Sequence, residues 1–500
     1  MSRPGARWCR GGVVVLIGMA AACQQDVVRP WNQEVAGIRV SVRRVDDGSL
    51  GSPTEPLPMP DPSDVTRGLR LVLDLEVQAA DGSGRVQADR WVRVSARPGK
   101  VTLVPGTGVG GNDVLLEGGH REGIEMVLTA AFGTTHVWAT DVGFVPRTRI
   151  GQVAACSNGQ DDDGDGLIDG GDPGCLDGTD DSEDAGSGAA GVSVPIQFQN
   201  PSLAEVQGFA SQSPFAGENV TVERGDLVVT RVTSDGMYVT DIADTAGRGY
   251  NHLFVFSFNT PTSIPDCQED EQESLACSTQ QSIVVRPCDR LAMVQGILSE
   301  FYGFTEMNFP TWRLVPWDPA RDVCPIPEPA PLDATTLNGK GSLPMEALEA
   351  ALVRVRDVDL PDPDRDFVNC DQNGDGAVNF RDYGTNTCDS ECQCRESCDA
   401  NPLCLELTQY HDYGQWPVRV GGPGGVKLWV SSRDSVPSFD PFDPTVPRHL
   451  SAVTGTLRNL SFLKPKPWIL EPRCEDDLTR EGDPPSAATA CVRVRTTEEP

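Results

Sequence analysis

The chain has 500 residues, with 73 Asp and Glu against 41 Lys and Arg, and its formal net charge is −32 at pH 7. A polyanion of this size repels nucleic acids and anionic lipids unless calcium or a local basic patch intervenes, so the composition argues against a nucleic-acid partner. Hydrophobic residues make up 38%, enough to bury cores, while 51 glycines and 40 prolines favour short strands and turns over long helices.

Residues 1–22 have the order of an export signal. Three arginines form a basic start, residues 13–19 form a short apolar core, and three alanines precede Cys23. The apolar stretch is too short to cross a bilayer as a permanent helix. Ordinary signal peptidase and the lipoprotein pathway would both accept this cleavage site.

We favour lipidation of Cys23. Removing Cys9 with the signal and lipidating Cys23 leaves 14 of the 16 cysteines, an even number for disulfides. Residues 23–30 would then tether the protein to a membrane. Gln24, rather than aspartate, follows the cysteine, and in lipoproteins of Gram-negative type this predicts the outer membrane. The sequence leaves open which face of that membrane carries the protein.

Residues 31–148 predict an immunoglobulin-like β-sandwich. Short segments of alternating or β-branched character are separated by turn-rich pieces. Within residues 69–77 the apolar side chains alternate, which predicts a strand with one buried face. The pattern is typical of an all-β sandwich. Its predicted strands are residues 35–45, 69–77, 91–96, 125–131 and 136–142.

An acidic loop, residues 150–184, follows and is clamped between Cys156 and Cys175. Oxygen ligands recur at positions 1, 3, 5, 7, 9 and 12, and Gly166 stands at position 6, where a calcium loop must turn sharply. The alternative is a disordered acidic linker, but such a linker has no reason to keep glycine at the sixth position. The expected calcium ligands are Asp161, Asp163, Asp165, the carbonyl of Leu167, Asp169 and Asp172.

After a glycine-rich linker, residues 185–193, residues 194–330 form a new unit. Its motif residues are Gly225, Asp226, Tyr238, Asp241, Phe256, Asp289, Gly296, Phe301, Gly303, Thr305 and Glu306. Their order resembles the OB-fold modules that precede the catalytic domain of secreted bacterial nucleases. Cys288 departs from the pattern, because these modules usually place glycine there. The resemblance implies a small closed barrel, whose expected interior residues are Val228, Phe254, Phe256 and Ile297.

Residues 331–480 predict a second, more divergent OB-like barrel. Residues 345–359 predict a short helix and then a strand. The closing motif consists of Val453, Thr454, Gly455, Leu470, Pro472, Arg473, Asp476 and Asp477. It resembles the end of the same nuclease-associated modules. The catalytic domain that would follow has no counterpart before Pro500, so nuclease activity is not carried over. DNA binding is not carried over either, because the chain is strongly acidic. Residues 481–500 are expected to form a tail.

A cysteine-rich insertion, residues 361–407, interrupts the second barrel and holds another loop of the calcium spacing. Gly376 again stands at position 6. The expected ligands are Asp371, Asn373, Asp375, the carbonyl of Ala377, Asn379 and Asp382. This loop resembles the calcium loop of dockerins, and the first loop is also similar to the acidic repeats of thrombospondin. A dockerin would continue into a helix and a repeated loop, so cohesin binding is not implied.

Six cysteines crowd this insertion: Cys370, Cys388, Cys392, Cys394, Cys398 and Cys404. A zinc site of thiolates is one interpretation, and three disulfides that stabilise a module too small for its own core are the other. An exported chain favours the disulfides, whose pairing stays open. Elsewhere, proximity in sequence predicts the pairs Cys156–Cys175, Cys267–Cys277, Cys288–Cys324 and Cys474–Cys491.

The chain contains no H-E-x-x-H, G-x-S-x-G or phosphate-loop motif, so we assign no catalytic residue. Trp416, Trp429, Tyr410 and Tyr413 could line a sugar-binding face, although packing in a barrel core is the interpretation we favour. The sequence therefore predicts a mainly β, lipid-anchored, calcium-stabilised surface protein that binds or scaffolds without catalysis. Its expected partners are the membrane, through the anchor, and a surface protein or polysaccharide. The alternative is an accessory substrate-binding subunit of an extracellular hydrolase or nuclease.

Overall fold

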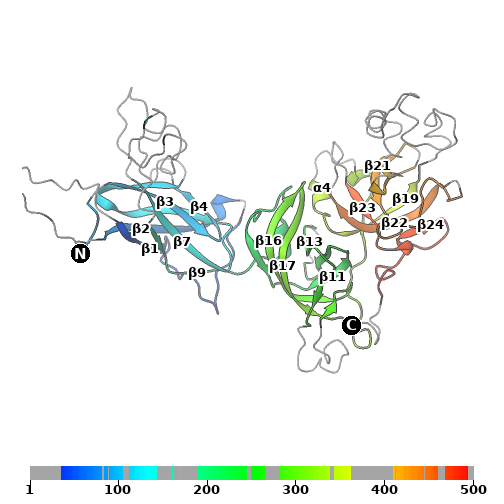
Figure 1. The fold of residues 1–500 in the computed structure, drawn as a ribbon, viewed down its shortest axis with the longest axis horizontal. Helices are drawn as coiled ribbons and strands as arrows, with labels where there is room; N and C mark the ends of the chain where they lie inside the picture. The colour runs from blue at the N-terminus through cyan, green and yellow to red at the C-terminus, as the bar shows by residue number, and fades with distance from the viewer. Residues whose placement is uncertain are drawn as a thin grey trace, which may run out of the picture.

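The structure is a computed structural model of the chain and is mainly β, with 48% strand and 8% helix. Three β units follow one another along the long axis, coloured blue to cyan, green, and yellow to red in Figure 1. Among the described residues, no helix is long and apolar enough to cross a membrane. The described residues are 35–62, 64–80, 84–87, 89–104, 112–143, 160, 168, 189–244, 249–265, 282–337, 343–361, 409–410, 413–422, 424–443, 445–459 and 468–493.

The N-terminal unit consists of two β-sheets around one hydrophobic core. One sheet has the order β1 (Val35–Arg44), β2 (Leu69–Ala79), β6 (His120–Thr129) and β4 (Lys100–Leu103). The other contains β5 (Asp113–Leu116), β3 (Arg90–Arg97), β7 (Thr134–Gly143), β8 (Ala190–Val192) and β9 (Ile196–Gln197). Two single-turn helices are η2 (Val65–Arg67) and η3 (Glu117–Gly119). Leu71, Leu73, Leu75 and Val77 of β2 are buried, so the predicted alternation is confirmed.

The end of the predicted linker is part of this unit. Residues 190–192 form β8 and pair with residues 138–140 of β7. Gly191 allows this docking, because a Cβ there would lie 1.9 Å from the carbonyl oxygen of Ile38. The expectation of a free linker over these residues is therefore wrong. The acidic loop leaves and re-enters the N-terminal unit on two neighbouring antiparallel strands.

The middle unit contains a closed five-stranded barrel. Its strands are β11 (Leu227–Val232), β12 (Gly236–Asp241), β13 (His252–Phe256), β16 (Arg290–Phe301) and β17 (Phe304–Val315), with β10 (Asn219–Val222) attached to β16. The ring runs β11–β12–β13–β17–β16 and closes from β16 to β11. Only β13 and β17 are parallel within this ring. The remaining elements are α1 (Leu203–Gln207), β14 (Thr262–Ser263) and β15 (Ile283–Val284).

The third unit repeats this barrel. Its strands are β19 (Leu352–Asp359), β20 (Gln415–Val420), β21 (Val426–Ser431), β22 (His449–Arg458) and β23 (Ile469–Glu471), flanked by β18 (Ala330–Pro331) and β24 (Leu478–Arg480). The ring runs β19–β20–β21–β23–β22, and β21 and β23 are parallel. Both rings therefore have the same strand order, which fits the barrels that the resemblance implies. The helices are α3 (Ala334–Leu337), α4 (Leu343–Glu346) and η8 (Glu475–Asp477).

The interior of the first barrel differs by one position from our expectation. Its core side chains include Leu227, Val229, Leu253, Val255, Leu298 and Met307. The expected residues Val228, Phe254, Phe256 and Ile297 therefore point outward, because successive strand residues face opposite sides. Ile297 is 40% exposed. The outward positions of β11 and β13 are apolar because the second barrel covers them: Val228 packs in a cluster with Leu352, and Phe254 in one with Ala350.

The two barrels meet around one buried carboxylate, that of Glu471. Arg231 of the first barrel donates from Nη1 to Glu471 Oε2 at 2.9 Å, and the Tyr238 hydroxyl donates to the same oxygen at 3.2 Å. Arg458 of the second barrel lies 2.7 Å from Glu471 Oε1. Burial alone would raise the pKa of Glu471, but Arg458 and Arg231 outweigh it and hold that pKa below its usual value. Glu471 is therefore ionised and joins both barrels.

Candidate functional site

Most residues of the predicted ion, lipid and disulfide sites lie outside the described part of the chain. These are Cys23, both sets of calcium ligands (Asp161, Asp163, Asp165, Leu167, Asp169, Asp172; Asp371, Asn373, Asp375, Ala377, Asn379, Asp382), and Cys156, Cys175, Cys267, Cys277, Cys370, Cys388, Cys392, Cys394, Cys398 and Cys404. Within the described residues, no group of three or more His, Cys, Asp or Glu could hold a metal ion. The ends of the cysteine-rich insertion are described: it leaves β19 and returns on β20, which pair antiparallel.

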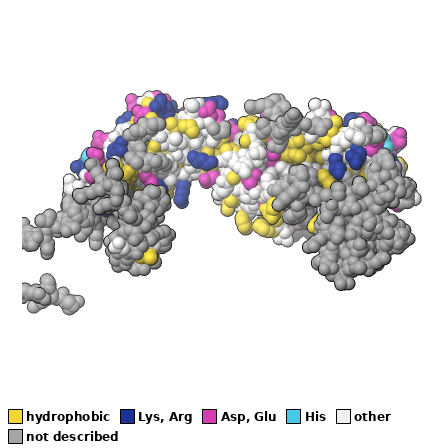
Figure 2. Space-filling model, turned by 90° about the horizontal axis from the view of Figure 1, so that it is seen from above, with side chains coloured by type: hydrophobic (Ala, Val, Ile, Leu, Met, Phe, Trp, Pro, Cys, Tyr) yellow, Lys and Arg dark blue, Asp and Glu magenta, His cyan; other side chains and the backbone are white. Residues whose placement is uncertain are grey.

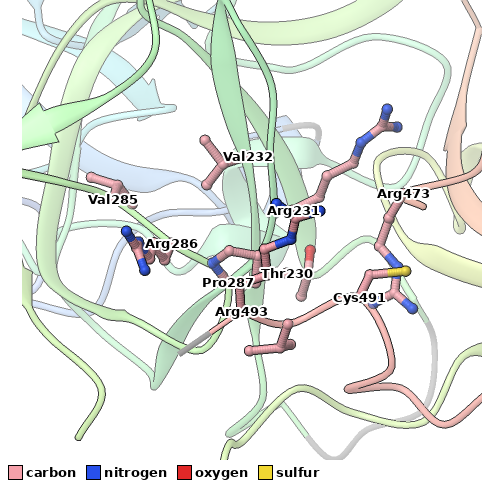
Figure 3. A pocket seen from close by; sticks show the side chains of 10 residues that line it. Thr230, Arg231, Val232, Val285, Arg286, Pro287, Arg473, Cys491 and Arg493 are labelled. Atoms are coloured by element: carbon pink, nitrogen blue, oxygen red, sulfur yellow. The ribbon is translucent and has the colours of Figure 1, made fainter. Parts of the chain in front are cut away.

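A cleft of about 470 Å³ opens where the first barrel meets the end of the second. The first barrel contributes residues 230–232 of β11 and residues 285–287, which follow β15. The second contributes Arg473 and residues 491–493. Figure 3 shows these side chains, with Arg286 and Arg473 on opposite sides of the view. The cleft is thus a feature of the two barrels together.

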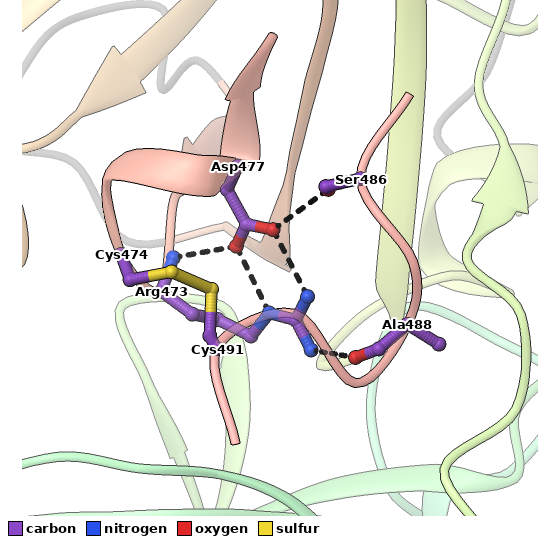
Figure 4. The surroundings of a disulfide bond; sticks show 6 residues. All are labelled: Arg473, Cys474, Asp477, Ser486, Ala488 and Cys491. Carbon is purple, nitrogen blue, oxygen red and sulfur yellow. Dashed lines mark hydrogen bonds and ion pairs between the residues drawn. A yellow bond between two sulfur atoms is a disulfide. The ribbon is translucent and has the colours of Figure 1, made fainter. Parts of the chain in front are cut away.

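The second barrel's wall of this cleft is held by a disulfide and an ion pair (Figure 4). Cys474 is bonded to Cys491, with Cα atoms 5.7 Å apart, which is the pairing expected from the sequence. Arg473 donates from Nε and Nη2 to the two carboxylate oxygens of Asp477, both at 2.9 Å. Its Nη1 donates to the carbonyl of Ala488 at 2.6 Å. A bidentate pair of this kind fixes direction as well as distance, so the wall is preformed.

A second expected disulfide lies beside the same cleft, in one hydrophobic cluster with Val492. Cys288 is bonded to Cys324, with Cα atoms 5.1 Å apart. Both sulfurs belong to a cluster with Val228 and Leu352, one residue from each barrel. The disulfide therefore fastens the segment between the barrels to the first of them.

Most of the aromatic residues that we considered as a sugar-binding face lie in the core of the second barrel. Trp416 is fully buried, and its indole Nε1 donates to Ser432 Oγ at 3.0 Å. Trp429 is buried, while Tyr410 is half-buried and packs against Phe442 with ring centroids 5.1 Å apart. Only Tyr413 of the four is exposed. The favoured interpretation, packing in the second barrel, is confirmed for Trp416.

An aromatic ledge, formed by Phe256, Phe258 and Phe309, occupies the surface of the first barrel instead. Phe258 is 53% exposed and Phe309 69% exposed. The ring centroids of Phe256 and Phe258 are 4.5 Å apart, and those of Phe258 and Phe309 are 5.3 Å apart. Figure 2 shows hydrophobic side chains gathered at the surface of the middle of the molecule, whereas charged side chains crowd the N-terminal unit. The ring of Phe254 contacts that of Phe256 and lies further in, where the second barrel covers it.

The backbone at the two exposed phenylalanines adopts a left-handed conformation. Phe258 has a φ of 62° and Phe309 a φ of 50°. Bulky residues rarely adopt such angles, and the cost is roughly 1–3 kcal/mol for each. Strain of this size persists where the surroundings impose it, and it is concentrated at binding sites. The sequence signal for the ledge was the spacing of Phe254, Phe256 and Phe258 by two, of which we had assigned Phe254 and Phe256 to the barrel interior.

Three polar side chains lie beside the ledge on β16 and β17. Asn308, which pairs with Phe256 across the parallel strands, donates from Nδ2 to Ser299 Oγ at 2.6 Å and to Glu306 Oε1 at 3.0 Å. Glu306 Oε2 makes no hydrogen bond to a described residue. Burial raises the pKa of Glu306, and the negative charge of Asp235 raises it further. The hydrogen bonds from Asn308 and Ser299 lower this pKa, but they do not cancel the effect of burial. The group offers a carboxyl, an amide and a hydroxyl next to exposed rings.

A second buried carboxyl, that of Glu349, lies between the barrels. Its Oε2 accepts from Gln207 Nε2 at 2.6 Å and from the Thr305 amide at 3.2 Å, while its Oε1 is buried with no hydrogen-bond partner among the described residues. Burial raises the pKa of Glu349 to about 8, and the charge of Glu346 adds to the shift. Glu349 is therefore neutral at pH 7, unlike Glu471.

The chain matches no known family model, no curated protein and no solved structure. The functional argument therefore rests on the geometry described above.

The raised pKa of Glu349 makes barrel stability depend on pH. An unfolded glutamate, with a pKa of 4.5, ionises before the folded one, so this contribution is fully present below pH 4.5 and is lost as pH rises towards 8. The loss is on the order of 4 kcal/mol. We expect Glu349→Gln, which cannot ionise, to raise the melting temperature in calorimetry much more at pH 8.5 than at pH 4.5.

Glu328→Gln is the matched control, because the Glu328 side chain is 79% exposed. It should leave the pH profile of the wild-type protein unchanged. An equal effect of Glu349→Gln at both pH values would show that Glu349 is not held neutral.

Proposed function

We propose that this protein is an exported, lipid-anchored, calcium-stabilised binding protein that holds a neutral glycan on the aromatic ledge. The observation that carries the proposal is the exposed pair of rings, Phe258 and Phe309, beside the partly unbonded carboxyl of Glu306. An immunoglobulin-like N-terminal unit would separate the anchor at Cys23 from two OB-like barrels. The protein would act by binding, without catalysis.

The chemistry of the ledge suits a sugar ring. One face of a pyranose presents C–H groups, which pack against an aromatic ring, while its rim presents hydroxyls that both donate and accept hydrogen bonds. Phe258 and Phe309 supply rings tilted by 41° to each other. Glu306 and Asn308 supply acceptors beside them, because the two amide N–H groups of Asn308 are donated to Ser299 and Glu306. A mainly apolar surface with a few directed polar groups is typical of a small-molecule site.

Charge favours a glycan over a single-stranded nucleic acid. Nucleic-acid sites combine stacking rings with a basic groove along the phosphate backbone. Here the polar group beside the rings contains Glu306, and the negative charge of Asp235 further raises the pKa of Glu306. Phosphates would be repelled from such a surface. The same ledge would serve the alternative function, an accessory subunit that holds a polysaccharide for an extracellular hydrolase.

The ledge predicts retention of the protein on neutral polysaccharides. We expect the full chain to bind at least one of cellulose, chitin and a soluble β-glucan, measured by pull-down and affinity electrophoresis. Phe258→Ala and Phe309→Ala should each weaken binding about fivefold, since one aromatic contact is worth about 1 kcal/mol.

Phe301→Ala is the matched control. Phe301 is also an exposed phenylalanine of the first barrel, but it lies at the turn between β16 and β17 and contacts Tyr302 instead of the ledge. Equal losses for Phe301→Ala and Phe309→Ala, or binding of single-stranded DNA with none of the glycans, would contradict the proposal.

Calcium is proposed to stabilise the two acidic loops. Each loop leaves one strand and returns on its antiparallel neighbour, β7 and β8 in one case and β19 and β20 in the other. Without an ion, each pair of carboxylates about 4 Å apart costs about 1 kcal/mol in water, and more when partly desolvated. A calcium ion that binds the folded loop but not the unfolded chain then adds to the free energy of unfolding.

We expect the protein to melt at a clearly higher temperature in millimolar calcium than in chelator. Asp161→Ala and Asp371→Ala should each remove part of that shift, roughly additively, because the loops belong to different units. Magnesium should replace calcium poorly, because it requires a smaller octahedral shell. Titration calorimetry that detects no calcium uptake would rule out both sites.

A further inference from the structure

The N-terminal unit carries a group of recognition-competent side chains on the outer side of the sheet that contains β3, β7 and β8. The strands β3 and β7 lie side by side in this sheet (Figure 1). The residues that alternate with the group along both strands are buried in the core, so the group points away from it. We call this surface the tryptophan face, and it consists of Ser95, Arg97, His136, Trp138 and Thr140.

The register of β3 and β7 makes these residues immediate neighbours. Arg97 lies opposite His136, and Ser95 lies opposite Trp138. Arg97 and Trp138 are therefore diagonal neighbours, with Cα atoms roughly 7–8 Å apart, a distance that long and aromatic side chains bridge. On its other side Trp138 pairs with Val192 of β8. An indole, a guanidinium, an imidazole and a hydroxyl thus share one small area.

The polar groups of the tryptophan face are open to a ligand. None of its five residues makes a side-chain hydrogen bond, an ion pair or a ring contact with a described residue. Trp138 is 37% exposed, and Arg97 is also exposed. The polar atoms of the half-buried Ser95, His136 and Thr140 reach the solvent, because none of them is among the buried atoms without a partner. The face therefore combines an exposed ring with unused donors and acceptors.

The charge of this face is opposite to that of the whole chain. Asp141 is the one acidic residue within β3, β7 and β8, and it is buried in a pair with Arg90. Arg93 is paired with Asp113 of β5, so Arg97 holds the uncompensated positive charge of the face. Charges farther away than about 8 Å are largely screened at physiological ionic strength. A ligand here responds to Arg97 more than to the net charge of −32.

We propose that the tryptophan face binds an acidic polysaccharide through a hexuronate unit. The C–H face of the sugar ring packs on the indole of Trp138, and the carboxylate pairs with the parallel N–H donors of Arg97. The imidazole and the two hydroxyls of the face supply donors and acceptors for the sugar hydroxyls. This site is independent of the aromatic ledge, because it lies in another unit and takes a charged sugar.

Two other anionic partners fit the tryptophan face less well. Single-stranded nucleic acids combine several stacking rings with a basic groove along the phosphates, whereas this face has one exposed ring and one uncompensated arginine. Anionic membranes attract clusters of about four or more basic residues. A single carboxylate beside a sugar ring needs only the one guanidinium that Arg97 provides.

Titration calorimetry of the oxidised full chain with trigalacturonate and trimannuronate, at physiological salt, tests the proposal. We expect at least one of them to bind, and its methyl ester to bind about tenfold more weakly, because the ester keeps the ring and loses the charge. Trp138→Ala should weaken binding of the acid and of the ester alike, each about fivefold. Arg97→Gln should weaken binding of the acid about tenfold and leave the affinity for the ester unchanged.

Arg39→Gln and Phe258→Ala are the matched controls, and both should leave binding of the uronate unchanged. Arg39 is an exposed arginine of β1 in the other sheet of the same unit, and Phe258 belongs to the ledge. Arg97 is exposed, so Arg97→Gln should melt at the wild-type temperature. No binding of either uronate, equal binding of acid and ester, equal losses in Arg39→Gln and Arg97→Gln, or binding of phosphatidylglycerol vesicles in place of the uronates would each overturn the proposal.

Discussion

The arrangement of the two barrels depends on the buried carboxylate of Glu471. A carboxylate taken out of water costs several kcal/mol unless charges and donors around it compensate. Arg231 and Tyr238 come from the first barrel and Arg458 from the second, so compensation is complete only when the barrels are docked. Such a network favours one relative position of the barrels over others, because a shifted interface would leave charges buried and unpaired.

The ledge and the cleft follow from that docking. The outward face of β12 and β13 carries Tyr238 and Phe254, which the second barrel covers near Ala350. The same row of rings continues past the covered region and ends in the ledge, so docking determines where the ledge begins. The cleft lies between β11, which contributes Arg231, and residues 491–493. One arginine thus joins the interface to the cleft.

The sequence predicts the local features of this fold better than its long-range contacts. Alternation in β2 predicts a buried face, and proximity predicts Cys288–Cys324 and Cys474–Cys491, because each depends on residues close together in the chain. In β13 both faces are apolar, so a period of two cannot show which one is interior. The contact of Arg231 with Glu471 spans 240 residues and leaves no pattern in either segment. The ledge and the cleft depend on that contact and required the structure.

Calorimetry of Glu471→Ala tests the docking most directly. The substitution leaves the buried Arg231 and the half-buried Arg458 without their partner, which should cost about 3–5 kcal/mol. Glu76→Ala breaks only the exposed pair with Arg39, 3.5 Å apart, and should cost less than about 1 kcal/mol. The account predicts that the barrels of the wild-type protein melt together, and that in Glu471→Ala they melt separately and at lower temperature. Equal melting of Glu471→Ala and Glu76→Ala, or separate barrel transitions in the wild-type protein, would contradict it.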